Sequence, residues 1–520
     1  MTEITKGITY LNEYKSLKKA VDEGKTPVLT VGLSAIHKAN LAAALGADTA
    51  RPVLVLTDDD NAANRFAADL RGFSEREVVV LPPRELVMAD VAGVSRGYEQ
   101  ARLAALDTLS GACFAVASVQ AAAQRTMPPA LLASSIVTLK AGEEAPLDEL
   151  THRLTDAGYE RCSQVEGMGQ FSVRGGILDI FPPQAEHPYR VEFWDDEIDS
   201  ISTFDVGSQR RLEQCETLRC LPCMEALPSL AQGGAAGLAK AVAALASSRR
   251  KKQHAELQKN LERDAERLRE SGTLPAADKY LPLIYPQMAT AFDYLPENTL
   301  ILIEDTPRLR DAARDFHARI ADDVTALMER GELPGGMDGY ALDFAGICSI
   351  KRQIVRMDSF LNSIPELAPQ HLENFVANQM NAYGGNLDMA SADIRSYTEQ
   401  GRAVAVVCGS TLRCKNMFDA LTDSGLKVQL SDLLPKGGCV NIMEGTISAG
   451  FEYPDLGLVV MTEGQVLARR KKAKVKRSNR DRVKSFTDLS PGDLVVHEHH
   501  GIGRFIGMER MTVDGSERDF

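Results

Sequence analysis

The 520-residue sequence has no apolar run that approaches the roughly 18 residues of a membrane-spanning helix. Its first residues, Met1-Thr2-Glu3-Ile4, lack the basic and apolar regions of a signal peptide. Its nine cysteines do not follow the spacing of a disulfide scaffold. These absences predict a protein of the reducing cytoplasm rather than a secreted or membrane protein.

The sequence also lacks an excess of positive charge. It has 72 acidic and 59 basic residues, a formal net charge of −13, which argues against a protein that coats nucleic acid over its whole surface. Basic residues instead gather in the segment 469–484, which holds ten of them and one acidic residue. We interpret this segment as a solvated basic linker, for which weak contact with a DNA backbone is the alternative.

The order of the apolar runs predicts an α/β multidomain protein. The chain begins with strands alternating with amphipathic helices, the pattern of a Rossmann-type, mainly parallel sheet. Short strands and turns then indicate an inserted α+β domain with an antiparallel sheet. The run Thr299 to Ile303 is predicted as a strand that rejoins the first sheet, and a second α/β domain follows. The predicted boundaries are 1–128, 129–218 (inserted domain), 219–345 (second part of the first domain), 346–465 (second α/β domain), 466–485 (basic linker) and 486–520, a final domain that stops within a strand.

The first strand leads into V-G-L-S-A-I-H-K-A-N, residues 31–40, which has the layout of a phosphate-binding loop. Gly32 and Lys38 stand where the pattern G-x-x-x-x-G-K-[ST] requires them. His37 replaces the second glycine and obstructs the backbone cradle. Ala39 replaces the hydroxyl that binds Mg²⁺. The stretch is therefore either an ordinary turn or a degenerate, non-functional phosphate loop, and no catalytic residue is assigned.

The most specific stretch runs from V-E-G-M-G-Q-F-S-V-R-G-G-I-L-D-I-F-P-P at residue 165 to the aspartate at 205. It resembles the domain that the excinuclease protein UvrB and transcription-repair-coupling factors (Mfd) share, which in that family binds a second excinuclease protein, UvrA. The resemblance implies UvrA contacts by Arg174, Arg190 and Trp194. Arg190 and Trp194 lie four apart on one predicted strand and so face the same side. The alternative is that both arginines pair with local carboxylates and that Trp194 is buried.

The stretch L-S-P-G-D-L-V-V-H-E-H-H-G-I-G-R-F-I-G-M, residues 489–508, resembles the RNA-polymerase-interacting domain of transcription-repair-coupling factors, a tudor-like β-barrel also found in CarD-type regulators. Barrels of this kind can add a strand to a partner's sheet. The residues nominated for contact with the β subunit of RNA polymerase are Val495, Val496, His497, Glu498 and His499. We expect this sequence to hold only the start of such a barrel.

The motif Y-G-G-N-L-D at residues 383–388 and the stretch G-T-I-S-A-G-F at 445–451 resemble the domain between the repair and polymerase modules of this family, which we interpret as a spacer. The resemblance thus covers nearly the whole chain. It favours the degenerate loop over the ordinary turn, because transcription-repair-coupling factors keep the UvrB fold without a working phosphate loop. The stretch Val80 to Gly97 also has no aromatic residue that could clamp DNA as the UvrB hairpin does.

Two clusters could suggest metal or redox chemistry. His497, His499 and His500 do not have the spacing of a zinc motif. Cys220 and Cys223 form a C-x-x-C without a thioredoxin-like context or further ligands nearby. We predict no metal site and interpret the two cysteines as buried thiols.

The resemblance implies the N-terminal part of a transcription-coupled nucleotide excision repair factor that recruits UvrA to RNA polymerase stalled at DNA damage. Complete members are ATP-dependent double-stranded-DNA translocases of helicase superfamily 2, and their motor, with its ATP, Mg²⁺ and most of the DNA contacts, is absent from this sequence. We expect this chain to be an adaptor without a cofactor, not an enzyme. The alternatives are a UvrB-like excinuclease component, which would need an intact phosphate loop, and a CarD-type regulator, which would need no repair module.

Overall fold

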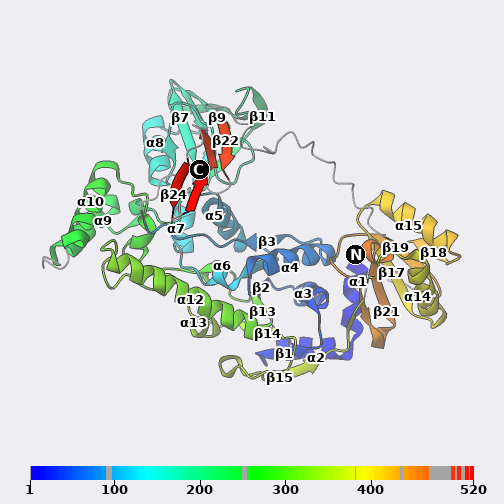
Figure 1. Ribbon diagram of the computed structural model, residues 1–520. Helices are drawn as coiled ribbons and strands as arrows, with labels where there is room; N and C mark the ends of the chain where they lie inside the picture. The colour runs from blue at the N-terminus through cyan, green and yellow to red at the C-terminus, as the bar shows by residue number, and fades with distance from the viewer. Residues whose placement is uncertain are drawn as a thin grey trace. The chain divides into compact units, whose positions relative to one another are not determined.

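The computed structural model describes residues 2–89, 96–248, 255–380, 382–433 and 437–467, together with four strands at 494–497, 501–504, 510–513 and 516–519 (Figure 1). The chain divides into two units, Met1–Val466 and Leu467–Phe520. None of the described helices is long and apolar enough to cross a membrane.

A seven-stranded sheet forms the centre of the first unit, and every pairing in it is parallel. Its inner strands are short, mainly apolar runs that are buried on both faces, as expected for a parallel sheet covered by helices, whereas the edge strand β15 is polar and partly exposed. In spatial order they are β15 (His371–Asn374), β1 (Val28–Val31), β14 (Gln353–Met357), β13 (Leu300–Glu304), β2 (Val53–Thr57), β4 (Phe114–Ser118) and β3 (Val78–Leu81).

Helices cover both faces of this sheet (Figure 1). One face packs on α3 (Ala35–Thr49) and α4 (Asp60–Phe73), with α1 (Thr2–Gly7) and α2 (Asn12–Asp22) beside them. The helices that share the core of the other face are α5 (Gly97–Leu109), α6 (Val119–Ala123), α7 (Pro129–Ser135), α9 (Gly234–Ser248), α10 (Ala255–Ser271), α11 (Leu281–Ile284), α12 (Thr306–Glu329) and α13 (Phe344–Cys348). Short 3-10 helices span Ile8–Tyr10, Pro228–Leu230, Ala277–Tyr280, Ala291–Tyr294, Pro365–Leu367 and Pro454–Leu456.

At the carboxyl ends of three strands, the sequence supplies a residue that caps the next helix. The side chains of Asp59, Ser118 and Asp305 accept hydrogen bonds from the first turns of α4, α6 and α12, respectively. Each cap satisfies a backbone donor that the helix itself leaves unpaired. These residues therefore fix where each strand ends and its helix begins.

The inserted domain is an antiparallel sheet of five strands with a sixth, β6, joined in parallel. In order the strands are β11 (Arg211–Cys215), β10 (Glu197–Phe204), β9 (Tyr189–Trp194), β8 (Ile177–Ile180), β7 (Gln170–Arg174) and β6 (Glu160–Arg161). A separate pair, β5 (Val137–Lys140) and β12 (Thr217–Cys220), leads into and out of the domain. Helix α8 (Leu147–Asp156) packs on one face of the six-stranded sheet with these two strands.

The spacer domain holds a third, six-stranded sheet, as the sequence predicted for a second α/β domain. Its strands in order are β16 (Asn378–Gln379), β20 (Phe451–Tyr453), β21 (Leu458–Thr462), β17 (Ala403–Cys408), β19 (Val440–Glu444) and β18 (Val428–Leu430), and its helices are α14 (Leu387–Glu399), α15 (Thr411–Asp423) and α16 (Glu463–Val466).

The division between the first domain and the spacer differs from the boundary drawn at residue 345. Strands β14 and β15 lie after that boundary in sequence, yet both pair with β1 of the first sheet. The first domain therefore extends to about residue 376, and the spacer sheet begins at β16. The strand predicted at 299–303 does rejoin the first sheet, as β13 between β14 and β2.

The described residues of the second unit form two pairs of antiparallel strands. Strand β22 (Leu494–His497) pairs antiparallel with β23 (Gly501–Arg504), and β24 (Arg510–Val513) pairs antiparallel with β25 (Ser516–Asp519). Short antiparallel strands agree with the expectation of a CarD-like fold. The greater part of the predicted basic linker lies outside the described residues.

Candidate functional site

The three residues predicted to contact UvrA lie on one face of the six-stranded sheet. Arg174 pairs across the strands with Ile177, which pairs with Glu192. Arg190 lies two residues from Glu192 on β9, so its side chain points to the same side. The alternate residues, including Val173, Leu178 and Val191, form the core with α8 on the other face. The interpretation that Arg190 and Trp194 share a side is confirmed by their places on β9.

Trp194 is the last residue of β9 and is 82% exposed. It opens the turn to β10, in which Asp195 takes a left-handed conformation with φ 57°. Asp195, Asp196 and Glu197 are all exposed next to it. A core position for Trp194 is thus excluded. An exposed indole beside a tight turn is a suitable anchor for a partner's pocket.

Arg174 lies close to the same end of the sheet. It precedes the turn Gly175-Gly176, where the carbonyl of Gly176 accepts a hydrogen bond from the backbone N–H of Phe193 at 2.8 Å. The side chain of Arg174 is exposed, and its one hydrogen bond among the described residues is a long one, 3.4 Å from Nε to Ser172 Oγ. No described carboxylate forms an ion pair with it. Arg174 is therefore available for an acidic partner.

Arg190 is held differently. Its Nε and Nη2 atoms donate to the two carboxylate oxygens of Asp179 at 2.7 and 2.8 Å, and the guanidinium lies 4.6 Å from the ring centroid of Phe204. The hydrogen bond to Asp179 is the main reason why the pKa of Arg190 is raised. The alternative of pairing with a local carboxylate thus holds for Arg190 and not for Arg174.

Asp179 and Ile177 are members of this surface that the sequence interpretation did not single out. Asp179 lies in an apolar strand, I-L-D-I, where a buried carboxylate needs a cationic partner. That signal could have indicated a paired aspartate, but its partner could not have been named without the register of the strands. Ile177 is 36% exposed between Arg174 and Glu192, and adds apolar area to the charged row.

The degenerate phosphate loop lies between β1 and α3, where Gly32 and Ala35 are exposed and residues 36–40 are buried. Gly32 has φ 84°, and a Cβ placed on it would lie 2.1 Å from the carbonyl oxygen of Phe375. The N–H of Phe375 donates to the carbonyl of Val31 at 3.0 Å, which fixes this close approach. The backbone after β15 thus lies directly against Gly32.

His37 is fully buried at the start of α3. Its ring packs edge-on against Phe451 and Tyr453 of β20, with centroid separations of 5.3 and 5.1 Å. Nδ1 lies 2.7 Å from the hydroxyl of Ser34. Burial lowers the pKa of His37 to about 4, so the ring is neutral near pH 7.

Lys38 is 4% exposed and Ala39 is fully buried. Burial is the main reason why the pKa of Lys38 is lowered, and the nearby carboxylates of Glu304, Asp305 and Asp358 oppose that shift. Lys38 therefore balances acidic groups at the carboxyl ends of β13 and β14. With a methyl group at residue 39, the loop lacks the oxygen that would hold Mg²⁺ there.

The thiols of the C-x-x-C motif are buried, with Cys220 1% and Cys223 2% exposed. Burial raises the pKa of Cys220 to about 12 and that of Cys223 well above its usual value, which keeps both as unreactive thiols. Within the described ranges, no group of three His, Cys, Asp or Glu side chains is placed to hold a metal ion. His499 and His500 lie outside those ranges.

Of the residues nominated for polymerase binding, Val495, Val496 and His497 lie in β22, where they pair with Gly503, Ile502 and Gly501 of β23. Glu498 and His499 lie outside the described residues. The nominated segment is therefore a strand over its first three residues, as strand addition to a partner's sheet requires.

The chain thus combines an inserted domain that has one open sheet face with a C-terminal unit of short antiparallel strands. Residues 137–225 match the family model of the UvrB interaction domain, and residues 489–520 match that of the CarD-like/TRCF RID domain. Over its whole length the chain is 30% identical to the transcription-repair-coupling factor of Bacillus subtilis (strain 168) and 25% identical to that of Staphylococcus aureus (strain USA300). The resemblance predicted from the sequence is confirmed. The chain spans 45% of the length of each of these relatives.

Proposed function

We propose that this chain recruits UvrA through the open face of its inserted domain in transcription-coupled nucleotide excision repair. The observation that carries the proposal is the exposed Trp194 on the same face as Arg174, which forms no ion pair with a described carboxylate, within the part that matches the UvrB interaction domain. Tryptophan and arginine are the residue types that most often dominate binding energy at interfaces. The ion pair between Arg190 on β9 and Asp179 on β8 holds these two neighbouring strands in register.

A second contact, with the β subunit of RNA polymerase, is proposed for β22 of the CarD-like segment. The match to the CarD-like/TRCF RID domain supports it, together with the strand at Val495 to His497. A protein that holds both contacts would bring UvrA to a polymerase stalled at DNA damage. A cytoplasmic location follows from these proposed partners.

We further propose that the loop from Gly32 to Ala39 does not bind or hydrolyse ATP, and that the module acts as an adaptor without a cofactor. The close approach of the Phe375 backbone to Gly32, the buried His37 and the methyl group of Ala39 support this. We assign the ATP-dependent DNA translocation implied by the resemblance to the part of such factors that this chain does not span.

The proposal is tested by calorimetric titration of UvrA with the whole chain and with two single variants, Arg174→Ala and Trp194→Ala. Each variant should weaken binding about 30-fold, the equivalent of about 2 kcal/mol for an interface hot spot. Tyr98→Ala is the matched control, because Tyr98 is also an exposed aromatic residue, 72% exposed, but lies on α5 outside the inserted domain. Equal affinity of all four proteins would refute the assignment of this face.

A further inference from the structure

The spacer sheet has two apolar faces, and its own helices cover one of them. Helices α14 and α15 contact β17 and lie on the outer side of the sheet (Figure 1). Ala405 and Val407 of β17, with Leu458 and Val460 of β21, belong instead to the core that contains α3 and α4 of the first domain. The four strands β21, β17, β19 and β18 pair in parallel, and parallel strands need cover on both faces; the first domain supplies the second layer.

Ring contacts join the two domains at the start of α3. His37 packs against Phe451 and Tyr453 of β20, and the hydroxyl of Tyr453 donates to Asn40 Oδ1 at 2.9 Å. Phe451 also packs edge-on against Phe73 at the end of α4, with a centroid separation of 5.9 Å. Apart from Phe73 on α4, these side chains belong to α3 or β20. A single strand of the spacer, β20, therefore contacts both the start of α3 and the end of α4.

A second contact lies along α4. The buried carboxylate of Asp69 accepts hydrogen bonds from the backbone N–H and the hydroxyl of Ser448, both at 2.7 Å. Burial raises the pKa of Asp69, and the two bonds from Ser448 oppose that shift. A carboxylate buried between two domains is stable only while its donors stay in place.

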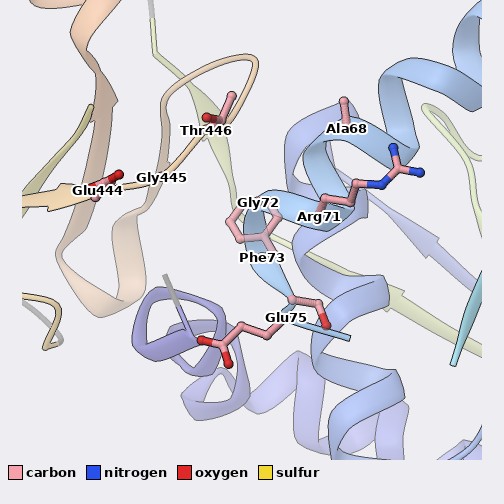
Figure 2. A pocket seen from close by; sticks show the side chains of 9 residues that line it. Ala68, Arg71, Gly72, Phe73, Glu75, Glu444, Gly445 and Thr446 are labelled. Carbon is pink, nitrogen blue, oxygen red and sulfur yellow. The ribbon is translucent and has the colours of Figure 1, made fainter. Parts of the chain in front are cut away.

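The backbones come closest at Gly72. A Cβ on Gly72 would lie 2.1 Å from the carbonyl oxygen of Thr446 and 3.0 Å from Ile447 Cγ2. Figure 2 shows the rim of this contact, where Glu444, Gly445 and Thr446 of the spacer face Ala68, Arg71 and Gly72 of α4 across a cavity of about 410 Å³. A residue without a side chain is thus required at Gly72 by the close approach of the spacer backbone, and not by the conformation of α4.

We propose that α3 and α4 form a layer shared by two sheets, and that the spacer therefore moves with the first α/β domain as one body. Helix α3, which would follow a phosphate-binding loop, also forms part of the domain contact here, because the spacer packs on its first turn. The domain between the repair and polymerase segments is then a fixed platform rather than a flexible connector. This inference does not depend on the proposed UvrA contact.

Hydrogen exchange measured by mass spectrometry on the whole chain tests the proposal. In Gly72→Ala the added methyl group wedges against Thr446, so amides at the start of α3 and those in β17 and β21 should exchange at least tenfold faster, and together. The matched control is Gly111→Ala at the end of α5, where the nearest atom to a new Cβ, Thr108 O, lies at 3.9 Å. This control should leave the exchange of both sheets unchanged.

Tyr453→Phe serves as a second variant if Gly72→Ala does not fold. It removes one hydroxyl and its bond to Asn40, which should raise the exchange of α3 and of the spacer strands together by about fivefold, the equivalent of about 1 kcal/mol. The proposal is overturned if either variant accelerates exchange in the spacer strands alone. It is also overturned if neither folded variant changes the exchange of α3.

Discussion

Arg190 and Asp179 form a two-bond ion pair across neighbouring strands of the inserted domain, with 2.7 Å from Nε to Oδ1 and 2.8 Å from Nη2 to Oδ2. The Asp179 side chain is 5% exposed and that of Arg190 is 19% exposed. The arginine thus has a structural task whether or not UvrA touches it. Its replacement changes the fold and the proposed interface together.

Arg190→Ala should lower the free energy of unfolding by about 3 kcal/mol, because it leaves the buried carboxylate of Asp179 unpaired. Urea unfolding followed by circular dichroism measures this loss. In the double variant Asp179→Ala/Arg190→Ala, the loss should be smaller than the sum of the two single losses. Additive losses would mean that the pair contributes nothing beyond its separate side chains.

Trp194→Ala separates binding from folding. Because Trp194 is exposed, this change should alter the free energy of unfolding by no more than about 0.5 kcal/mol. It is therefore a cleaner probe of UvrA binding than Arg190→Ala, whose loss of affinity would include a loss of folded structure.

Much of this surface could be predicted from the sequence, because strand periodicity is local. A spacing of four residues was enough to place Arg190 and Trp194 on one side of β9. Which of the two predicted arginines is free depends on the register that brings Asp179 opposite Arg190, and register is set by non-local pairing. The sequence therefore indicated the right strand without separating Arg174 from Arg190.

The domain boundary was harder to predict for the same reason. The apolar runs that become β14 and β15 carry no local mark of the sheet that they join. The shared layer was also not foreseen, although the run A-V-A-V-V in β17 is apolar on both faces and so requires cover on both. What local patterns do not reveal is which helices provide that cover.

Tryptophan fluorescence, excited selectively over that of the 12 tyrosines, should report on the inserted domain alone, because Trp194 is the single tryptophan of the chain. Since its side chain is exposed in the folded protein, urea unfolding should shift the emission maximum very little, while circular dichroism records a full transition. Acrylamide should quench the folded protein almost as well as free tryptophan. Weak quenching of the folded chain would show that the indole is covered.

Mg-ATP should leave the melting temperature of this 520-residue chain unchanged. A ligand at 100 times its dissociation constant stabilises a folded protein by about 2.7 kcal/mol, which is easily seen as a thermal shift. Lys38→Ala is the companion variant, and it should show the same lack of response to nucleotide. A shift seen in the wild type and lost in Lys38→Ala would mean that the loop still binds phosphate.

The stability of the contact between the first domain and the spacer should fall in acid because of His37. Burial lowers the pKa of His37 to about 4, against about 6.5 for an unfolded chain. The folded protein therefore binds fewer protons at this residue than the unfolded chain does. The contribution of the neutral ring is fully present above pH 6.5 and is lost as the pH falls towards 4, at most about 3 kcal/mol.

The buried carboxylates of Asp69 and Glu304 have raised pKa values and act in the opposite direction, so the effect of His37 must be isolated by difference. Urea unfolding at pH 7.5 and pH 4.5 should show a smaller loss of stability for His37→Gln than for the wild type, because glutamine does not titrate. His152→Gln is the matched control, since His152 is exposed on α8 and its removal should leave the wild-type pH dependence intact. Equal pH dependence in all three proteins would mean that His37 is solvated, and that β20 does not cover the first turn of α3 in solution.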